Sequence, residues 1–210
     1  MMYNIKMNKT YITVFIGLVA VFGFFIYFNN KPSYRNYPPK NPNIIAFGDS
    51  LVQGVGATKG YDFVSLLSIK TNKQIKNLGV SGNTTADGLA RINEAISYEP
   101  GTVILLLGGN DYLKKVPEEQ TFRNLKEIIF RLQSEGIFVV MLGIRGGLLT
   151  DHFESEFKAL SKEMHVPYVK NVLLGLLGND NYMSDAIHPN DIGYAIMADR
   201  IYKEVGKYLK

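Results

Sequence analysis

The sequence predicts a single α/β domain, with a parallel sheet covered by helices on both faces, preceded by one membrane-spanning helix. The sheet is predicted by short apolar runs rich in β-branched residues, which alternate with amphipathic stretches beyond Asn43. The position of small polar residues directly after several of these runs supports the same arrangement. The membrane helix is predicted by an uncharged apolar run near the N-terminus.

The apolar run, residues 11–28, reads YITVFIGLVAVFGFFIYF. As a helix it would be about 27 Å long, close to the thickness of a bilayer's hydrocarbon core. A cleaved signal peptide would have a shorter run and a small-residue processing site, but Asn29, Asn30 and Lys31 follow here. A buried core helix is the alternative, although the run is apolar all round. We expect residues 1–28 to form a short tail and an uncleaved membrane anchor.

Basic side chains flank the expected anchor on both sides, so the positive-inside rule does not decide its orientation. A short N-terminal tail usually stays in the cytoplasm and lets the larger domain follow outward. We therefore expect an extracytoplasmic domain on a single-pass N-terminal anchor.

The charge and the residue types of the chain exclude several classes of partner. The net charge is +4, but residues 1–40 hold five basic and no acidic side chains, which leaves 18 basic and 19 acidic ones beyond them. A domain without a basic excess is not expected to bind nucleic acid. The chain has no cysteine, and neither His152 nor His165 has metal-ligand spacing to a second histidine. We expect no metal and no cofactor.

The remaining elements follow in order along the chain. Residues 29–42, rich in Pro and Asn, predict an extended linker, and the domain is expected to span residues 43–210. Apolar residues at helical spacing predict helices from Phe122 to Leu132, from Phe153 to Met164 and from Ile192 to Val205. The expected strands are residues 44–47, 74–78, 102–107, 137–142 and 167–169.

Four short motifs place reactive or hydrogen-bonding groups in loops of this expected sheet. Ser50 follows the first strand in Gly-Asp-Ser-Leu, Gly82 follows the second in a glycine-containing loop, and Asn110 follows the third in Gly-Gly-Asn-Asp. Asp185 and His188 precede the last helix, and at this spacing a carboxylate can orient an imidazole. Taken singly, each motif is equally typical of a helix cap, a turn or a surface contact. Together they supply a nucleophile, an oriented base and oxyanion donors.

These motifs resemble the four marker blocks of the SGNH/GDSL hydrolase superfamily, which contribute Ser, Gly, Asn and His in that order. The surrounding sequences GDSL, GGND and DAIHPN look like its thioesterase/lysophospholipase and arylesterase branch. The resemblance implies a three-layer α/β/α, flavodoxin-like fold with a five-stranded parallel sheet. It also implies Ser50, Asp185 and His188 as catalytic residues, with the oxyanion hole formed by the amides of Ser50 and Gly82 and the side chain of Asn110.

The predicted function is therefore that of a serine hydrolase, which cleaves carboxylic esters or thioesters of small molecules or lipids through an acyl-enzyme on Ser50. A second enzyme hypothesis is the O-deacetylation of cell-envelope glycans, which membrane tethering fits equally well. A hypothesis of another class is a non-catalytic binding domain of the same fold, since a fold alone does not establish chemistry. The intact set of Ser50, Asp185 and His188 favours an enzyme.

Overall fold

The computed structural model describes residues 16, 18, 19, 21, 22, 33–144 and 152–209. It divides the chain into two units, Met1–Ser33 and Tyr34–Lys210. Most of the expected membrane helix, residues 11–28, lies outside the described residues. Within the described part of the chain, no helix combines the length and the apolar character needed to cross a bilayer.

The second unit is built on one five-stranded parallel sheet in the order β2-β1-β3-β4-β5. The strands are β1 (Ile44–Gly48), β2 (Ile75–Gly79), β3 (Thr102–Leu106), β4 (Phe138–Leu142) and β5 (Tyr168–Val169). Every residue of β1, β3 and β4 is buried, as expected for inner strands of a sheet that is covered on both faces. All five strands predicted from the apolar runs are confirmed.

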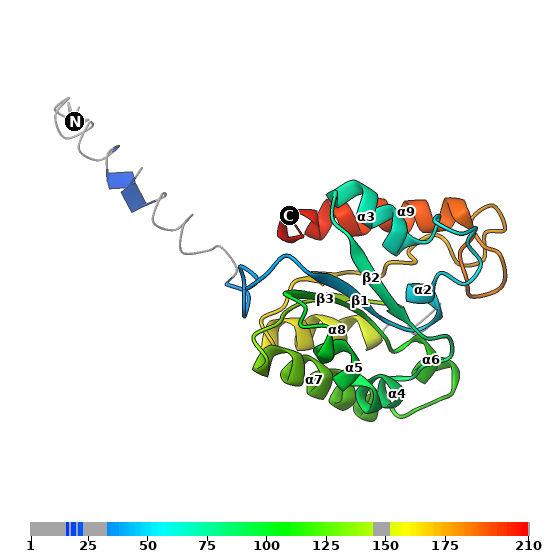
Figure 1. The fold of residues 1–210 in the computed structure, drawn as a ribbon, viewed down its shortest axis with the longest axis horizontal. Helices are drawn as coiled ribbons and strands as arrows, with labels where there is room; N and C mark the ends of the chain where they lie inside the picture. Colours follow the sequence, from blue (N-terminus) through cyan, green and yellow to red (C-terminus); the bar gives the residue numbers. More distant parts are fainter. Residues whose placement is uncertain (1–15, 17, 20, 23–32, 145–151, 210) are drawn as a thin grey trace, which may run out of the picture. The chain divides into compact units, whose positions relative to one another are not determined.

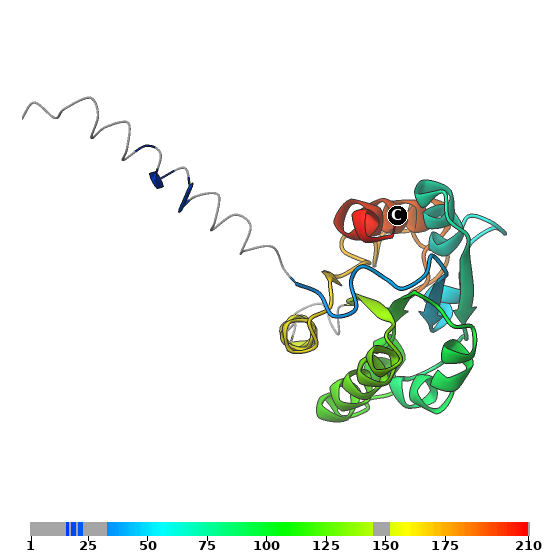
Figure 2. The same cartoon turned by 60° about the vertical axis from the view of Figure 1, so that its left-hand side comes forward.

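Helices cover both faces of the sheet and complete a three-layer α/β/α arrangement (Figure 1). The helices α3 (Phe63–Thr71) and α9 (Asp191–Val205) lie side by side on one face, and Figure 2 shows the same pairing from another side. The other face carries α4 (Thr85–Ala90), α5 (Ile92–Ser97), α7 (Glu118–Ser134) and α8 (His152–Glu163). Of these helices, α7, α8 and α9 are the three that the helical spacing predicted.

The connection after β1 runs to β2 at one edge of the sheet, and the connection after β2 returns past β1 to β3. The direction in which the strands are added therefore reverses between β1 and β3. Ligands of open α/β sheets bind outside the carboxyl ends of the strands at such a switch point. Two short helices start there, α2 (Ser50–Gln53) after β1 and α6 (Gly109–Leu113) after β3. The topology thus brings the loops that carry Ser50 and Asn110 to the same edge.

The segment before β1 packs against the domain, although the sequence predicted an extended linker for residues 29–42. The Asn36 side chain donates hydrogen bonds to the carbonyls of Gln133, at 2.9 Å, and Ile137, at 3.0 Å. The Tyr37 ring packs against Phe138 and Tyr208. The compact unit therefore begins at Tyr34, nine residues before the expected boundary at Asn43. Residues 29–32 of the predicted linker lie outside the described residues.

Candidate active site

Ser50 lies at the start of α2, in a tightly packed turn that follows β1. A Cβ atom added at Gly48 would lie 2.2 Å from the carbonyl oxygen of Leu106 on β3, so only glycine fits there. Asp49 is the N-cap of α2, and its carboxylate accepts a hydrogen bond of 3.0 Å from the Leu51 amide. Gly54, in the left-handed conformation, ends the helix after a single turn. The strand and the two caps together fix where the Ser50 side chain starts.

His188 joins Ser50 to Asp185 in one line of hydrogen bonds. Its Nε2 lies 2.9 Å from Ser50 Oγ, and its Nδ1 lies 2.7 Å from Asp185 Oδ2. Because a carboxylate only accepts hydrogen bonds, Nδ1 carries the proton in the neutral ring and Nε2 is left as an acceptor. The Ser50 hydroxyl therefore donates to His188. This is the geometry in which an imidazole can remove the proton of a serine.

The Asp185 carboxylate is held by the turn in which it lies. Its Oδ1 accepts hydrogen bonds of 2.8 Å from the amides of Ile187 and His188. The hydrogen bond from the His188 ring, together with these amides, lowers the pKa of Asp185 to about 2, because all of them favour the charged form. Asp185 therefore carries the negative charge that an imidazolium at His188 would need.

Asn110 is connected to the Gly82 loop through Asn83, the residue that follows Gly82. The Asn110 side-chain amide, on α6, donates a hydrogen bond of 2.9 Å to the main-chain carbonyl of Asn83, and its nitrogen lies 3.5 Å from Asp49 Oδ2. Gly82 has a φ of +80°, and a Cβ atom added there would meet nothing within 4 Å. The loop is thus open on the side of Gly82, and Asn110 is connected to the neighbours of both Gly82 and Ser50.

The structure brings all five predicted site residues to one edge of the sheet. Ser50, His188 and Asp185 are connected directly, whereas Gly82 and Asn110 join them through Asn83 and Asp49. In the described part of the chain there is no group of three His, Cys, Asp or Glu side chains that could hold a metal ion. The hydrogen-bonded line of Ser50, His188 and Asp185 has the geometry of a serine nucleophile with an oriented base.

Two buried carboxylates beside these residues were not predicted to belong to the site. Asp49 is 2% exposed, and burial raises its pKa to about 7. Asp111, fully buried, accepts hydrogen bonds from the Thr85 amide (2.8 Å) and hydroxyl (2.6 Å). Their positions next to Ser50 and Asn110 were the only signals in the sequence that could have indicated them.

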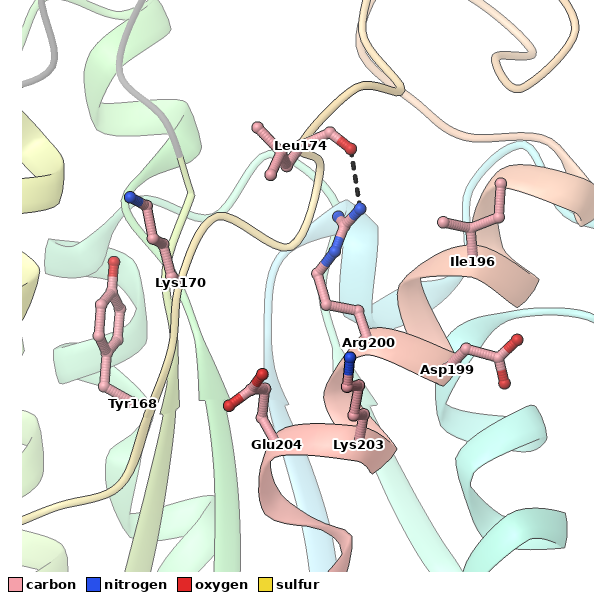
Figure 3. A pocket seen from close by; sticks show the side chains of 8 residues that line it. All are labelled: Tyr168, Lys170, Leu174, Ile196, Asp199, Arg200, Lys203 and Glu204. Carbon is pink, nitrogen blue, oxygen red and sulfur yellow. Dashed lines mark hydrogen bonds between the residues drawn. The ribbon is translucent and has the colours of Figure 1, made fainter.

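A separate depression of about 500 Å³ lies between β5 and α9, and Figure 3 shows its side chains. Arg200 extends from α9 and donates a hydrogen bond of 2.8 Å to the carbonyl of Leu174. None of its lining residues belongs to the predicted site. The lining residues are Tyr168, Lys170, Leu174, Ile196, Asp199, Arg200, Lys203 and Glu204.

Comparison with known proteins gives matches over most of the domain. Residues 46–196 match the GDSL-like lipase/acylhydrolase family. Esterase TesA of Pseudomonas aeruginosa is 29% identical over 70% of this chain and 79% of its own length. Thioesterase 1/protease 1/lysophospholipase L1 of Escherichia coli is 27% identical over 77% of this chain and 82% of its own. The crystal structure of AlinE4, described as an SGNH-hydrolase family esterase, is 30% identical and superposes with a TM-score of 0.63, covering 80% of this chain and 96% of that one.

Proposed function

Because this chain belongs to the GDSL-like lipase/acylhydrolase family, we propose that it is a hydrolase of ester bonds that works through an acyl-enzyme on Ser50. Ester hydrolysis is the activity that the names of its relatives share, and the resemblance found in the sequence pointed to the same family. The observation that carries the proposal is the line of hydrogen bonds from Ser50 through His188 to Asp185.

In the proposed reaction, His188 Nε2 takes the Ser50 proton while Oγ attacks the acyl carbonyl carbon. The carbonyl π electrons move to oxygen, and the amides of Ser50 and Gly82 with the Asn110 side chain donate hydrogen bonds to the oxyanion. His188 then gives its proton to the leaving alcohol or thiol as the bond to it breaks. Water repeats the sequence, with His188 as base, and releases the acid and free Ser50.

Exposed apolar side chains next to the site residues favour substrates with an apolar acyl or aryl group. Val80 is 42% exposed two residues before Gly82, and Tyr112 is 48% exposed two residues after Asn110. Ile187, directly before His188, is 39% exposed. Exposed apolar side chains within two residues of three proposed site residues are typical of a binding surface for apolar groups. They favour lipid or thioester acyl groups over the acetyl groups of a glycan.

We also propose that residues 11–28 anchor the domain in a membrane and that the domain lies outside the cytoplasm. The support is the uncharged run itself, with its length and its polar flanks. In intact cells, added protease should remove the domain from the membrane fraction, and sodium carbonate should not extract the full chain. Complete protection from protease would contradict the orientation, and release by carbonate would contradict the anchor.

Hydrolysis of p-nitrophenyl esters by the full-length chain in detergent micelles tests the proposed activity. We expect Ser50-dependent activity that rises from acetate through butyrate to octanoate. Ser50→Ala should abolish it, together with labelling by a fluorophosphonate, whereas Ser134→Ala, at an exposed serine of α7, should change neither. Activity confined to acetate would favour glycan deacetylation. A wild-type chain without ester hydrolysis or labelling would leave a non-catalytic binding domain as the better hypothesis.

A further inference from the structure

Arg91 lies at the junction of α4 and α5, and its side chain contacts the carboxyl ends of β1 and β2. Its Nη2 donates hydrogen bonds to the carbonyl of Gly48, at 2.8 Å, and to that of Leu78, at 3.0 Å. Its guanidinium carbon lies 4.1 Å from the centre of the Phe47 ring. The Arg91 side chain is only 18% exposed, and burial lowers its pKa because the charged form loses water. A cation buried in this way needs specific partners.

The same guanidinium also holds the loop that carries Gly82. Its Nε donates a hydrogen bond of 2.6 Å to the side-chain oxygen of Asn83. The main-chain carbonyl of Asn83 accepts the hydrogen bond from Asn110. The Arg91 side chain is therefore bonded to Gly48, at the strand end that leads to Ser50. It is also bonded to Asn83, which follows Gly82 and accepts a hydrogen bond from Asn110. Ser50, Gly82 and Asn110 are the residues whose donors were assigned above to the oxyanion hole.

We propose that Arg91 is a positioning residue for the oxyanion hole, which fixes the distance between the Ser50 turn and the Gly82–Asn110 side of the site. The inference rests on the function proposed for those three residues. In this role Arg91 acts through the residues it bonds and not on the substrate itself. It acts by keeping the donors where the oxyanion forms, and donors of this kind lose most of their effect when displaced by about 1 Å.

The need for arginine follows from the shape of the group. A guanidinium has five N–H donors in a rigid plane, so it can bond Asn83 from Nε and two carbonyls from Nη2 at once while lying against an aromatic ring. A lysine ammonium is a compact point charge on a flexible stem. It can keep one of these partners but not the whole set, so Arg91→Lys should loosen the loop without removing the charge.

Other contacts hold the same loop and limit the expected effect. Lys114 Nζ donates a hydrogen bond of 2.9 Å to the carbonyl of Gly82, and the Ser81 amide donates one of 2.8 Å to the side chain of Gln53. The loop should therefore stay folded when Arg91 is replaced, but the donors of the oxyanion hole should vary more in position. We expect kcat to fall about 10–100-fold, less than on removal of an oxyanion donor itself, with KM changed less than about threefold.

Arg200 provides the matched control. It is also a half-buried arginine whose guanidinium donates to main-chain carbonyls, those of Asn171, Val172 and Leu174, and burial lowers its pKa as well. Its contacts lie in the segment that follows β5, and β5 and β2 are the opposite edge strands of the sheet. Arg200→Lys and Arg200→Met should therefore lower Tm as much as the Arg91 variants do, while kcat per folded molecule stays within about twofold of wild type.

The test compares kcat, KM and Tm of Arg91→Lys, Arg91→Met and Asn83→Ala with those of the Arg200 variants, using the full-length chain and p-nitrophenyl butyrate. Folded active protein is counted by fluorophosphonate titration. A double variant of Arg91→Met with Asn110→Ala gives the second readout. If Arg91 acts through the oxyanion hole, its loss should cost much less when Asn110 is already absent than in the wild type.

Three results would overturn the inference. These are an Arg91→Met kcat per folded molecule within twofold of wild type, an equal loss of kcat in Arg200→Met, and effects of Arg91→Met and Asn110→Ala that simply multiply. A wild-type chain without Ser50-dependent hydrolysis would instead overturn the proposed function, and the inference about Arg91 with it. An active wild type with unchanged Arg91 variants would overturn the role of Arg91 alone.

Discussion

The two halves of the site are built in different ways. The half that we propose as the oxyanion hole, called the oxyanion half below, consists of Ser50, Gly82 and Asn110. It is held by bonds between residues far apart in sequence, such as Arg91 to Gly48 and Thr85 to Asp111. The acid–base half consists of Asp185 and His188. Its bonds lie almost entirely within one turn, in which Ser184 also bonds the carbonyl of His188.

Because of this difference, the two halves should contribute differently to stability and to catalysis. The long-range bonds of the oxyanion half are buried or partly buried, so removing one leaves a polar group without a partner and costs folding free energy. In the acid–base half the Asp185 side chain is 52% exposed, and water can replace lost bonds. Changes in the acid–base half should therefore affect the reaction much more than the fold, whereas changes in the oxyanion half should affect both.

The largest expected effect is on the reaction, from the acid–base half. Without its imidazole, Ser50 loses its base, so His188→Ala should lower kcat/KM by about 10⁴-fold or more. Tm should stay within about 2 °C of wild type. Steady-state kinetics and calorimetry measure the two quantities, and His152→Ala, at an exposed histidine, is the control. A large drop in Tm would show that the acid–base half also supports the fold.

The next effect comes from the oxyanion half. Asn110→Ala removes a donor to the oxyanion, and such a loss typically lowers kcat by about 10²–10³-fold. It also leaves the carbonyl of Asn83 without its donor, so a measurable loss of stability should accompany the loss of rate. Kinetics with p-nitrophenyl butyrate, together with thermal unfolding, would detect both. Full activity would exclude Asn110 from the oxyanion hole.

Variants of Asp111 and Asp185 compare the contributions of the two halves to stability. Asp111→Ala leaves the amide and hydroxyl of Thr85 without their acceptor in a fully buried place, and should cost about 3 kcal/mol of unfolding free energy. Asp185→Ala, in the exposed turn, should cost less than about 1 kcal/mol while removing most of the activity. Urea denaturation compares the two variants. Equal losses would break the distinction between the halves.

The smallest effect is a pH dependence of stability in the oxyanion half. Burial raises the pKa of Asp49 from 3.8 to about 7, so between these values the folded protein binds a proton more tightly than the unfolded chain. The contribution of Asp49 to stability should therefore decrease as pH rises from about 4 to 7 and then level off. Asp185 has the opposite sign, since its pKa is lowered to about 2, and its contribution is lost only as pH falls below about 4.

The neutral variant Asp49→Asn isolates this effect. Between pH 5 and 8, Tm of the wild type should fall by a few degrees more than Tm of Asp49→Asn, because asparagine does not titrate. Thermal unfolding in buffers of matched ionic strength measures the difference. Parallel curves for the two proteins would mean that Asp49 does not change its protonation in this range.

The elements that bury long apolar patterns could be predicted from the sequence. The five strands were predicted to within one residue at each start, because inner strands of a parallel sheet are almost continuous apolar runs. The helices α7, α8 and α9 were predicted because one face of each is apolar. Local spacing was also enough to pair Asp185 with His188, since both lie in one turn.

The other features could not be predicted without the folded structure, because the groups concerned have partners far along the chain. The short helices α2, α4, α5 and α6 are too short to show a helical period, and Asp111 binds Thr85 across 26 residues. Residues 34–42 have no apolar period either, yet Asn36 binds carbonyls 97 and 101 residues away. Arg91 has no motif of its own, and the carbonyls of Gly48 and Leu78 that it bonds come together only when β1 and β2 lie side by side. Hydrogen bonds between distant residues leave no period in the sequence, so folding alone reveals them.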